Sequence, residues 1–230
     1  MATALAPTPT FIQSLLERER VDLLATGRAR RWQAAETLVR RGDRADSAIV
    51  LLAGLVKIHT SVQGAEVLLG LSGPGDLLGE ATATAGARDA VRSATVTGLE
   101  PVEGVVIAVP SLRAFLAEHP RATLALLDLA LGRLYIADAR RMEFATSESL
   151  ARVAGRLVEL AERFGVQGGD GSIDVALPIT QEELASWSAS SRESTARALR
   201  TLRRLRLIET YRRGLTVLDL DGLRSHTPQL

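Results

Sequence analysis

The chain has 230 residues, which is enough for one large domain or two modest ones. Apolar residues make up 46% of the sequence and charged residues 24%, which excludes wholesale disorder, and the formal net charge of +1 favours no class of partner by itself. The sequence contains no cysteine, which excludes disulfides, thiolate catalysis, the usual structural zinc sites and cysteine-ligated iron–sulfur clusters.

The N-terminal segment lacks both a basic region and a continuous apolar run, and no later stretch approaches the roughly 20 apolar residues of a membrane span. Together with the absence of cysteine, this predicts a soluble protein of the reducing cytoplasm with no membrane partner. Lys57 is the only lysine, so arginine carries almost all of the basic charge. Arginine suits phosphate and guanine, although a GC-rich genome would produce the same bias.

Short apolar runs broken by turn residues extend from about Arg28 to Val109. The breaks contain glycine where a reversing chain needs backbone freedom, as at Gly54, Gly64 and the Gly-Pro-Gly-Asp sequence of residues 73–76. Such spacing is typical of an all-β sandwich or barrel. The segment is short, and we therefore predict a small β-roll.

A long helix is predicted from about Pro120 to Ser147, because leucines recur there at helical spacing. The stripe consists of Leu124, Leu127, Leu131 and Leu134 and continues to Asp138, Arg141 and Ala145. A helix of about 28 residues extends about 40 Å, which is longer than a compact small domain needs. We expect it to pair with the same helix of a second copy as a coiled coil; the alternative is that the stripe packs on its own β domain.

Residues that favour helix starts and turns follow at Thr146-Ser147-Glu148-Ser149, and a new amphipathic stretch begins after them. We predict a hinge and a domain boundary at this point. A polar, glycine-rich segment at residues 165–178 then predicts a loop with a short strand.

The C-terminal segment predicts two consecutive short helices joined by a turn. Thr180 can cap the first helix, because Glu183 stands three residues later in the capping-box pattern. A short turn at residues 188–190 follows, and either Ser190 or Ser191 can cap the second helix. This arrangement is a helix-turn-helix pattern.

Two strands and a run of arginines complete the segment. Strands around Ile208 and residues 215–217, joined through residues 212–214, would form a wing. Between Ser190 and Arg213 eight arginines stand against two glutamates, a local excess of six positive charges. The arginines are Arg192, Arg197, Arg200, Arg203, Arg204, Arg206, Arg212 and Arg213. A charge run is usually a solvated face, but its coincidence with a helix-turn-helix favours DNA as the partner.

The order ITQEEL, SSRESTARAL, LRRLRLIE and a glycine hairpin resembles the DNA-binding domain of the CRP/FNR family of transcription factors, whose recognition helix carries an SRE-T-x-x-R pattern. The resemblance implies that Arg192 and Arg197 bond guanines and that Glu193 accepts from cytosine, pairings that major-groove chemistry also favours. The side chains expected to hold phosphates are Thr180, Ser191 and Ser194.

The same resemblance implies a homodimer on a palindrome with TGTGA-like half-sites, and RNA polymerase as a further partner. The alternative for Glu193 and Arg197 is a surface ion pair one helical turn apart. Two positions depart from the family pattern: Ala189 stands where the turn often has glycine, and Ser194 replaces a common threonine. These departures leave the fold intact and bear only on half-site preference.

The resemblance extends upstream through TLVRRGD, IVLLAGLVKI, PGDLLGE and RSATV, in the order of the family's cyclic nucleotide-binding roll. Its phosphate-binding cassette is matched by Gly79-Glu80 and Arg92-Ser93-Ala94. By resemblance, Arg92 pairs the cyclic phosphate, Ser93 donates to it, and Glu80 accepts from the ribose 2′-hydroxyl. A short helix within residues 81–87 would aim its amides at the same phosphate.

Three possibilities stay open for the effector: a cyclic nucleotide such as cAMP, a different molecule, or a pocket that binds nothing because Glu80 and Arg92 bridge each other. The segment between these two residues is longer than in the best-known cAMP-responsive members. The part of the long helix that faces adenine in those members here contains Arg141, which we include as an effector-binding candidate. Cysteine-ligated iron–sulfur sensing is excluded, and three scattered histidines disfavour haem.

Other function classes are less well supported. β-rolls also occur in metalloenzymes, but no His-x-His spacing and no G-x-S-x-G nucleophile motif occurs here. We therefore expect no catalytic residue, no metal site and no cofactor other than the possible cAMP effector. A regulatory subunit that controls a partner protein would not need the arginine-rich winged motif.

The prediction is an α+β protein with three parts. Residues 1–119 form a sensor β-roll with flanking helices, residues 120–147 form a long dimerisation helix, and residues 148–230 form a winged helix-turn-helix that binds double-stranded DNA. The expected function is that of a CRP/FNR-type transcriptional regulator.

Overall fold

The computed structural model describes residues 9–81, 91–176 and 179–228. Its helices and strands are, in chain order, η1 (Ile12–Ser14), α1 (Glu17–Ala25), β1 (Arg28–Trp32), β2 (Thr37–Val39), β3 (Ser47–Ala53), β4 (Val56–Val62), β5 (Ala65–Ser72), β6 (Leu77–Leu78), β7 (Thr95–Gly98), β8 (Val102–Ala108), α3 (Val109–Glu118), α4 (Pro120–Thr146), α5 (Ser149–Phe164), β9 (Val166–Gln167), β10 (Ile173–Val175), α6 (Gln181–Trp187), α7 (Arg192–Arg204), β11 (Ile208–Tyr211), β12 (Gly214–Val217) and α8 (Leu220–Arg224).

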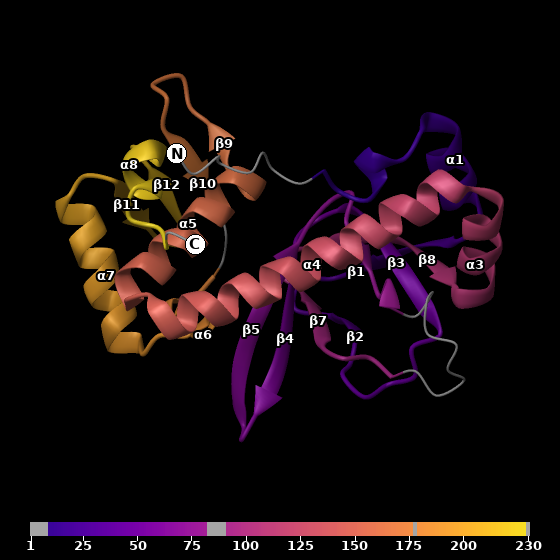
Figure 1. The fold of residues 1–230 in the computed structure, drawn as a ribbon, viewed down its shortest axis with the longest axis horizontal. Helices are drawn as coiled ribbons and strands as arrows, with labels where there is room; N and C mark the ends of the chain where they lie inside the picture. The colour runs from indigo at the N-terminus through magenta and orange to yellow at the C-terminus, as the bar shows by residue number, and fades with distance from the viewer. Residues whose placement is uncertain (1–8, 82–90, 177–178, 229–230) are drawn as a thin grey trace. The chain divides into compact units, whose positions relative to one another are not determined.

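The chain divides into two compact units (Figure 1). The roll unit contains Thr8–Thr60 and Leu69–Ile136, and the C-terminal unit contains Ser61–Leu68 and Ala137–Leu230. Helix α4 contributes residues to both. Within the described residues, no helix is long and apolar enough to cross a membrane.

The roll unit is built from two four-stranded sheets, with the strand orders β1-β8-β3-β6 and β2-β7-β4-β5. One core, formed around Trp32, Leu51 and Val102, lies inside the roll. A second core joins the strands to the helices through Phe11, Leu112 and other apolar side chains. Burial on both sides explains why the sequence of β3 is almost continuously apolar. The predicted β-roll is confirmed.

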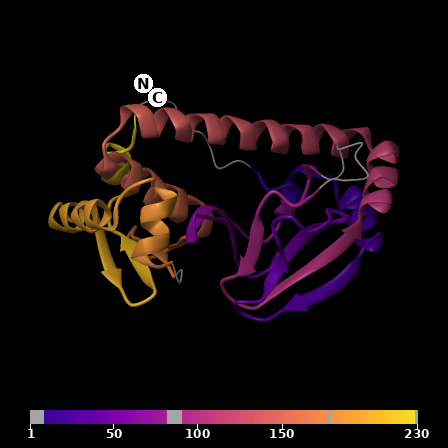
Figure 2. The ribbon, with the colours of Figure 1, turned by 90° about the horizontal axis from the view of Figure 1, so that it is seen from below.

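The predicted long helix is present as α4, which runs without a break for 27 residues (Figure 2). Ala122 and Leu126 on one face are buried in the core of the roll unit. The predicted leucine stripe lies on another face and is exposed: Leu124 is 61% exposed, Leu127 52%, Leu131 54% and Leu134 56%. The stripe therefore does not pack on its own β domain.

The C-terminal unit combines a four-stranded sheet, ordered β11-β12-β10-β9, with helices α5 to α8. Its core contains the buried side chains Val153, Leu157, Leu184, Leu199, Leu202, Ile208, Val217 and Leu223. Helix α5 packs against both α7 and α8. Helices α6 and α7 with the β11–β12 hairpin form the predicted winged helix-turn-helix.

Candidate functional site

Helix α6 begins with the predicted capping box. The Glu183 backbone N–H donates to Thr180 Oγ1 at 3.1 Å, and the Thr180 N–H donates to Glu183 Oε2 at 2.8 Å. Two backbone donors at the helix start thereby gain acceptors, which fixes where α6 begins. Leu184, Ala185 and Trp187 are buried and hold the helix against the rest of the C-terminal unit.

The turn between α6 and α7 places Ala189 in the left-handed region, with a φ of 47°. Glycine adopts this conformation without a steric penalty, which explains why the position often holds glycine in the related pattern. Of the two predicted caps for α7, Ser191 is the one used: its Oγ accepts from the Ser194 N–H at 3.1 Å. The turn and the cap therefore fix where α7 begins and how its first residues are oriented relative to α6.

The first two turns of α7 expose the three predicted base-reading side chains. The side chain of Arg192 is 76% exposed, that of Glu193 81% and that of Arg197 65%. Arg197 Nη2 donates to Glu193 Oε1 at 2.9 Å, so the predicted ion pair forms in the free chain. Arg192 lies 4.0 Å from Glu182 of α6. The opposite face of α7 is buried through Thr195, Ala198, Leu199 and Leu202.

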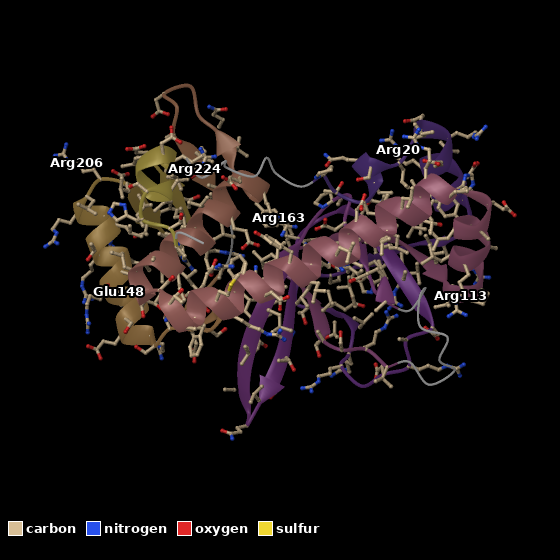
Figure 3. All side chains as sticks on the ribbon, in the orientation of Figure 1. Arg20, Arg113, Glu148, Arg163, Arg206 and Arg224 are labelled. Atoms are coloured by element: carbon tan, nitrogen blue, oxygen red, sulfur yellow. The ribbon has the colours of Figure 1, made fainter. Side chains whose placement is uncertain are left out.

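All eight predicted arginines between Ser190 and Arg213 are exposed. Arg206, which follows α7, stands on the outer side of the C-terminal unit (Figure 3). Arg212 and Arg213 form the tip of the wing, because Tyr211 pairs with Gly214 across the hairpin. The charge run thus coincides with a solvent-facing helix and hairpin, as phosphate binding requires.

Tyr211 fixes the wing to the neighbouring strand. Its hydroxyl donates to Asp174 of β10 at 2.9 Å. A Cβ atom at Gly214 would overlap the Tyr211 ring, so glycine is needed at this position. Partial burial, and then the hydrogen bond and charge of Asp174, raise the pKa of the Tyr211 hydroxyl, which keeps it a donor.

Two of the predicted cassette residues, Gly79 and Arg92, lie against each other in the roll unit. Arg92 is only 8% exposed, and its Nη2 donates to Ser47 Oγ at 3.1 Å. Burial lowers the pKa of Arg92, and the negative charges of Asp46 and Asp43 partly oppose that effect. A buried guanidinium of this kind gains from an anion placed beside it.

Gly79 lies directly against the Arg92 guanidinium. Its φ is 77°, and a Cβ atom there would collide with Arg92 Nη1. The positive φ therefore favours glycine, and a larger residue would displace the end of the Arg92 side chain. Ser93 is exposed and Ala94 is buried beside this point. The predicted short helix within residues 81–87 falls, apart from Ala81, outside the described residues.

Glu80 pairs with a residue that the sequence did not single out. In the described part of the chain its ion-pair partner is Arg133 of α4, not Arg92. Arg133 also donates to the Leu77 backbone oxygen at 2.8 Å. The sequence position of Arg133 could have indicated this contact, because Arg133 lies on the same helix face as the buried Ala122 and Leu126. A charged side chain on a buried helix face is stable only when an opposite charge or a hydrogen-bond acceptor lies beside it.

Arg141, the remaining effector candidate, belongs to the C-terminal unit. Its side chain is 80% exposed and donates to Asp138 one turn earlier at 2.8 Å. Its neighbour Arg140 instead packs inward, with Nη2 3.0 Å from Glu159 of α5. The proposed ligand contact of Arg141 stays a prediction.

Comparison with known proteins agrees with both halves of this description. A family model described as a Crp-like helix-turn-helix domain matches residues 151–226, and one described as a cyclic nucleotide-binding domain matches residues 29–119. The CRP-like cAMP-activated global transcriptional regulator of Mycobacterium tuberculosis is 31% identical over 164 residues, which cover 71% of each chain.

Two further similarities cover more of the chain. The transcriptional regulator LdrP of Thermus thermophilus is 30% identical over 200 residues, covering 84% of this chain and 94% of that protein. The structure of FixK2 from Bradyrhizobium japonicum shares the fold, with a TM-score of 0.75 at 16% identity, over 89% of this chain and 98% of that one. The chain therefore belongs to the CRP/FNR family, as a DNA-binding transcriptional regulator with a cyclic nucleotide-binding domain.

Proposed function

We propose that this regulator acts as a homodimer that reads a palindromic operator, with the start of α7 of each subunit in a major groove. The observation that carries the proposal is the exposure of Arg192 and Arg197 on the first two turns of a firmly capped helix. Arginine bonds guanine O6 and N7 bidentately, and Glu193 accepts from cytosine N4. The side chains proposed to hold phosphates are Thr180, Ser191 and Ser194.

The exposed leucine stripe of α4 supports the homodimer. Four leucines at alternating spacings of three and four residues are each more than half exposed. A contiguous apolar stripe of this kind is costly in water and is typical of the seam of a coiled coil. A two-fold dimer also presents two copies of α7, as a palindrome with half-sites about 34 Å apart requires.

The effector proposed for the roll unit is a cyclic nucleotide such as cAMP. Arg92 would bind the cyclic phosphate, with Gly79 leaving room, Ser93 and Ala94 closing one side, and Glu80, oriented by Arg133, accepting from the ribose. The burial of the Arg92 guanidinium supports an anionic ligand, because a phosphate beside it would offset the desolvation that lowers its pKa. Arg141 stays a candidate contact.

Effector binding would shift the dimer between two arrangements, changing whether the two recognition helices match successive major grooves. Each predicted domain would have one task. Residues 1–119 would bind the effector, residues 120–147 would form the dimer, and residues 148–230 would bind DNA. The proposal also holds that the protein is not an enzyme, acts in the cytoplasm, and contacts RNA polymerase at its promoters. The second candidate is the same regulator with a different effector or a pocket that binds none.

Operator binding is tested with a fluorescent palindromic duplex containing TGTGA-like half-sites. We expect Arg192→Ala and Arg197→Ala each to weaken specific binding by roughly 10-fold to 100-fold, because each loses a bidentate base contact worth about 1–3 kcal/mol. Arg113→Ala in α3 is the matched control, since it removes an exposed arginine outside the C-terminal unit. Unchanged affinity in both recognition-helix variants would refute base reading by α7.

Nucleotide binding is tested by calorimetric titration of the wild-type protein with cAMP and cGMP. We expect saturable binding of one of them, and at least about a 10-fold loss in Arg92→Ala, because a charge-assisted phosphate contact disappears. Arg141→Ala is titrated alongside, because Arg141 is the second candidate contact of the nucleotide. If neither nucleotide releases heat or raises the melting temperature, the second candidate is correct and DNA binding is unaffected by the result.

A further inference from the structure

The leucine stripe of α4, which is the proposed seam of the coiled coil, becomes charged towards the C-terminal end of the helix. The apolar positions alternate in steps of three and four residues from Leu124 to Leu134, which is the a and d pattern of a heptad repeat. Continuing the same steps reaches Asp138 at the next a position and Arg141 at the next d position. Both side chains are exposed, by 53% and 80%, and they pair with each other along the helix at 2.8 Å.

These two charges are flanked by large apolar side chains. Tyr135 and Met142 stand at the neighbouring e positions and are 64% and 49% exposed, and Phe144 stands at a g position and is 64% exposed. Residues at e and g border the seam of a coiled coil and cover it from water. A charged pair sheltered in this way interacts more strongly than one on an open surface.

We propose that Asp138 and Arg141 form an intersubunit layer of four charges, in which Asp138 of each copy pairs with Arg141 of the other and fixes parallel, in-register pairing of α4. This inference rests on the proposed homodimer and adds what sets its register. In a parallel coiled coil, the knob at an a position inserts into a hole of four residues that includes the following d residue of the facing helix. The pair is self-complementary, as a two-fold interface requires.

Out-of-register and antiparallel pairings of the same stripe would leave Asp138 and Arg141 without opposite charges on the facing helix. A shift by one heptad places Asp138 against Leu131 of the second copy, and an antiparallel pair places the charged end against the leucine end. Either arrangement buries a charge beside aliphatic side chains without a partner. A single polar layer in an otherwise apolar seam is the feature that commonly specifies register and orientation in coiled coils.

The test uses two single charge reversals in the full-length protein, D138R and R141D. D138R gives a homodimer layer with four positive charges, and R141D gives one with four negative charges. We expect each variant alone to dimerise roughly 10-fold or more weakly than wild type in sedimentation equilibrium, because like charges then face each other. An equimolar mixture regains dimers, and native mass spectrometry finds heterodimers well above the statistical share.

Two controls distinguish pairing between subunits from an Asp138–Arg141 pair that forms only within one helix. In the heterodimer of D138R with R141D neither helix retains an Asp–Arg pair of its own, so recovery requires bonds between subunits. The matched control reverses Arg31 and Glu103, an exposed pair 2.9 Å apart in the roll unit, and its mixture should give the statistical share. Statistical mixing of D138R with R141D, or full dimerisation of each alone, would overturn the charge layer. A monomeric wild-type protein would instead overturn the proposed homodimer.

Discussion

Ala189 shows how one residue limits the stability of the recognition motif. It holds a φ of 47°, a conformation that costs a residue with a Cβ atom about 1 kcal/mol. We expect Ala189→Gly to stabilise the C-terminal unit by roughly 0.5–1 kcal/mol in chemical denaturation. Ala196→Gly, in the interior of α7 where the backbone is helical, is the control and should destabilise by about 1 kcal/mol. A loss of stability in Ala189→Gly would contradict the strain.

The exposure of side chains on the C-terminal helices was more predictable from sequence than the contacts of buried side chains. Arg192, Glu193 and Arg197 follow from a local pattern, because a cap and a helical period decide which side chains face water. The pairing of Glu80 with Arg133 does not follow, since the two residues are far apart in sequence and meet only through the packing of α4 on the roll. Among the described residues Glu80 pairs with Arg133, so the alternative bridge between Glu80 and Arg92 is not formed there.

At the scale of elements, the end of α4 is held to α5 by partly buried ion pairs around the buried Arg156. The side chain of Arg156 in α5 is 5% exposed and pairs with Glu143 of α4 at 2.5 Å and with Glu159 at 3.2 Å. Arg140 of α4 pairs with the same Glu159, and both arginines lie over the ring of Trp187 in α6. Burial lowers the pKa of Arg156, while the two glutamates favour its charged form. The network joins three helices of the C-terminal unit.

We expect Arg156→Met to destabilise the C-terminal unit by about 3 kcal/mol, because it leaves Glu143 and Glu159 partly buried without their cation. Urea denaturation followed by circular dichroism measures the loss. Arg163→Ala is the matched control: this arginine also reaches Glu159, at 3.7 Å, but is 36% exposed, so its loss should stay below about 1 kcal/mol. Equal losses in the two variants would show that burial of the pair is unimportant.

The helices and strands themselves were largely predictable. Glycine-punctuated apolar runs predicted the roll, and capping residues predicted the starts of α6 and α7, because these signals act over a few residues. The segment of residues 146–149 was predicted as a hinge, yet Arg152 donates to the Ser188 oxygen at 2.9 Å and also to the Ser147 oxygen. Such cross-helix contacts depend on tertiary packing, which no local pattern encodes. The hinge remains a prediction.

At the scale of the whole molecule, three features are complementary to the proposed complex. The leucine stripe of α4 is exposed, the start of α7 exposes Arg192 and Arg197, and Arg92 is a buried cation of the roll unit. A dimer on DNA with a bound nucleotide would cover the stripe, place bases against the two α7 arginines and place a phosphate beside Arg92. Each part can fail separately, and the reading of DNA by paired recognition helices is the central claim.

Selection of duplexes from a randomised library by the wild-type protein tests this claim most directly. We expect an enriched sequence with two-fold symmetry, whose half-sites lie about 10 base pairs apart and contain guanines. Selection with Arg197→Ala should lose the preference at one symmetric pair of positions and keep the rest. Recovery of an asymmetric single site, or of no enriched sequence, would contradict the account.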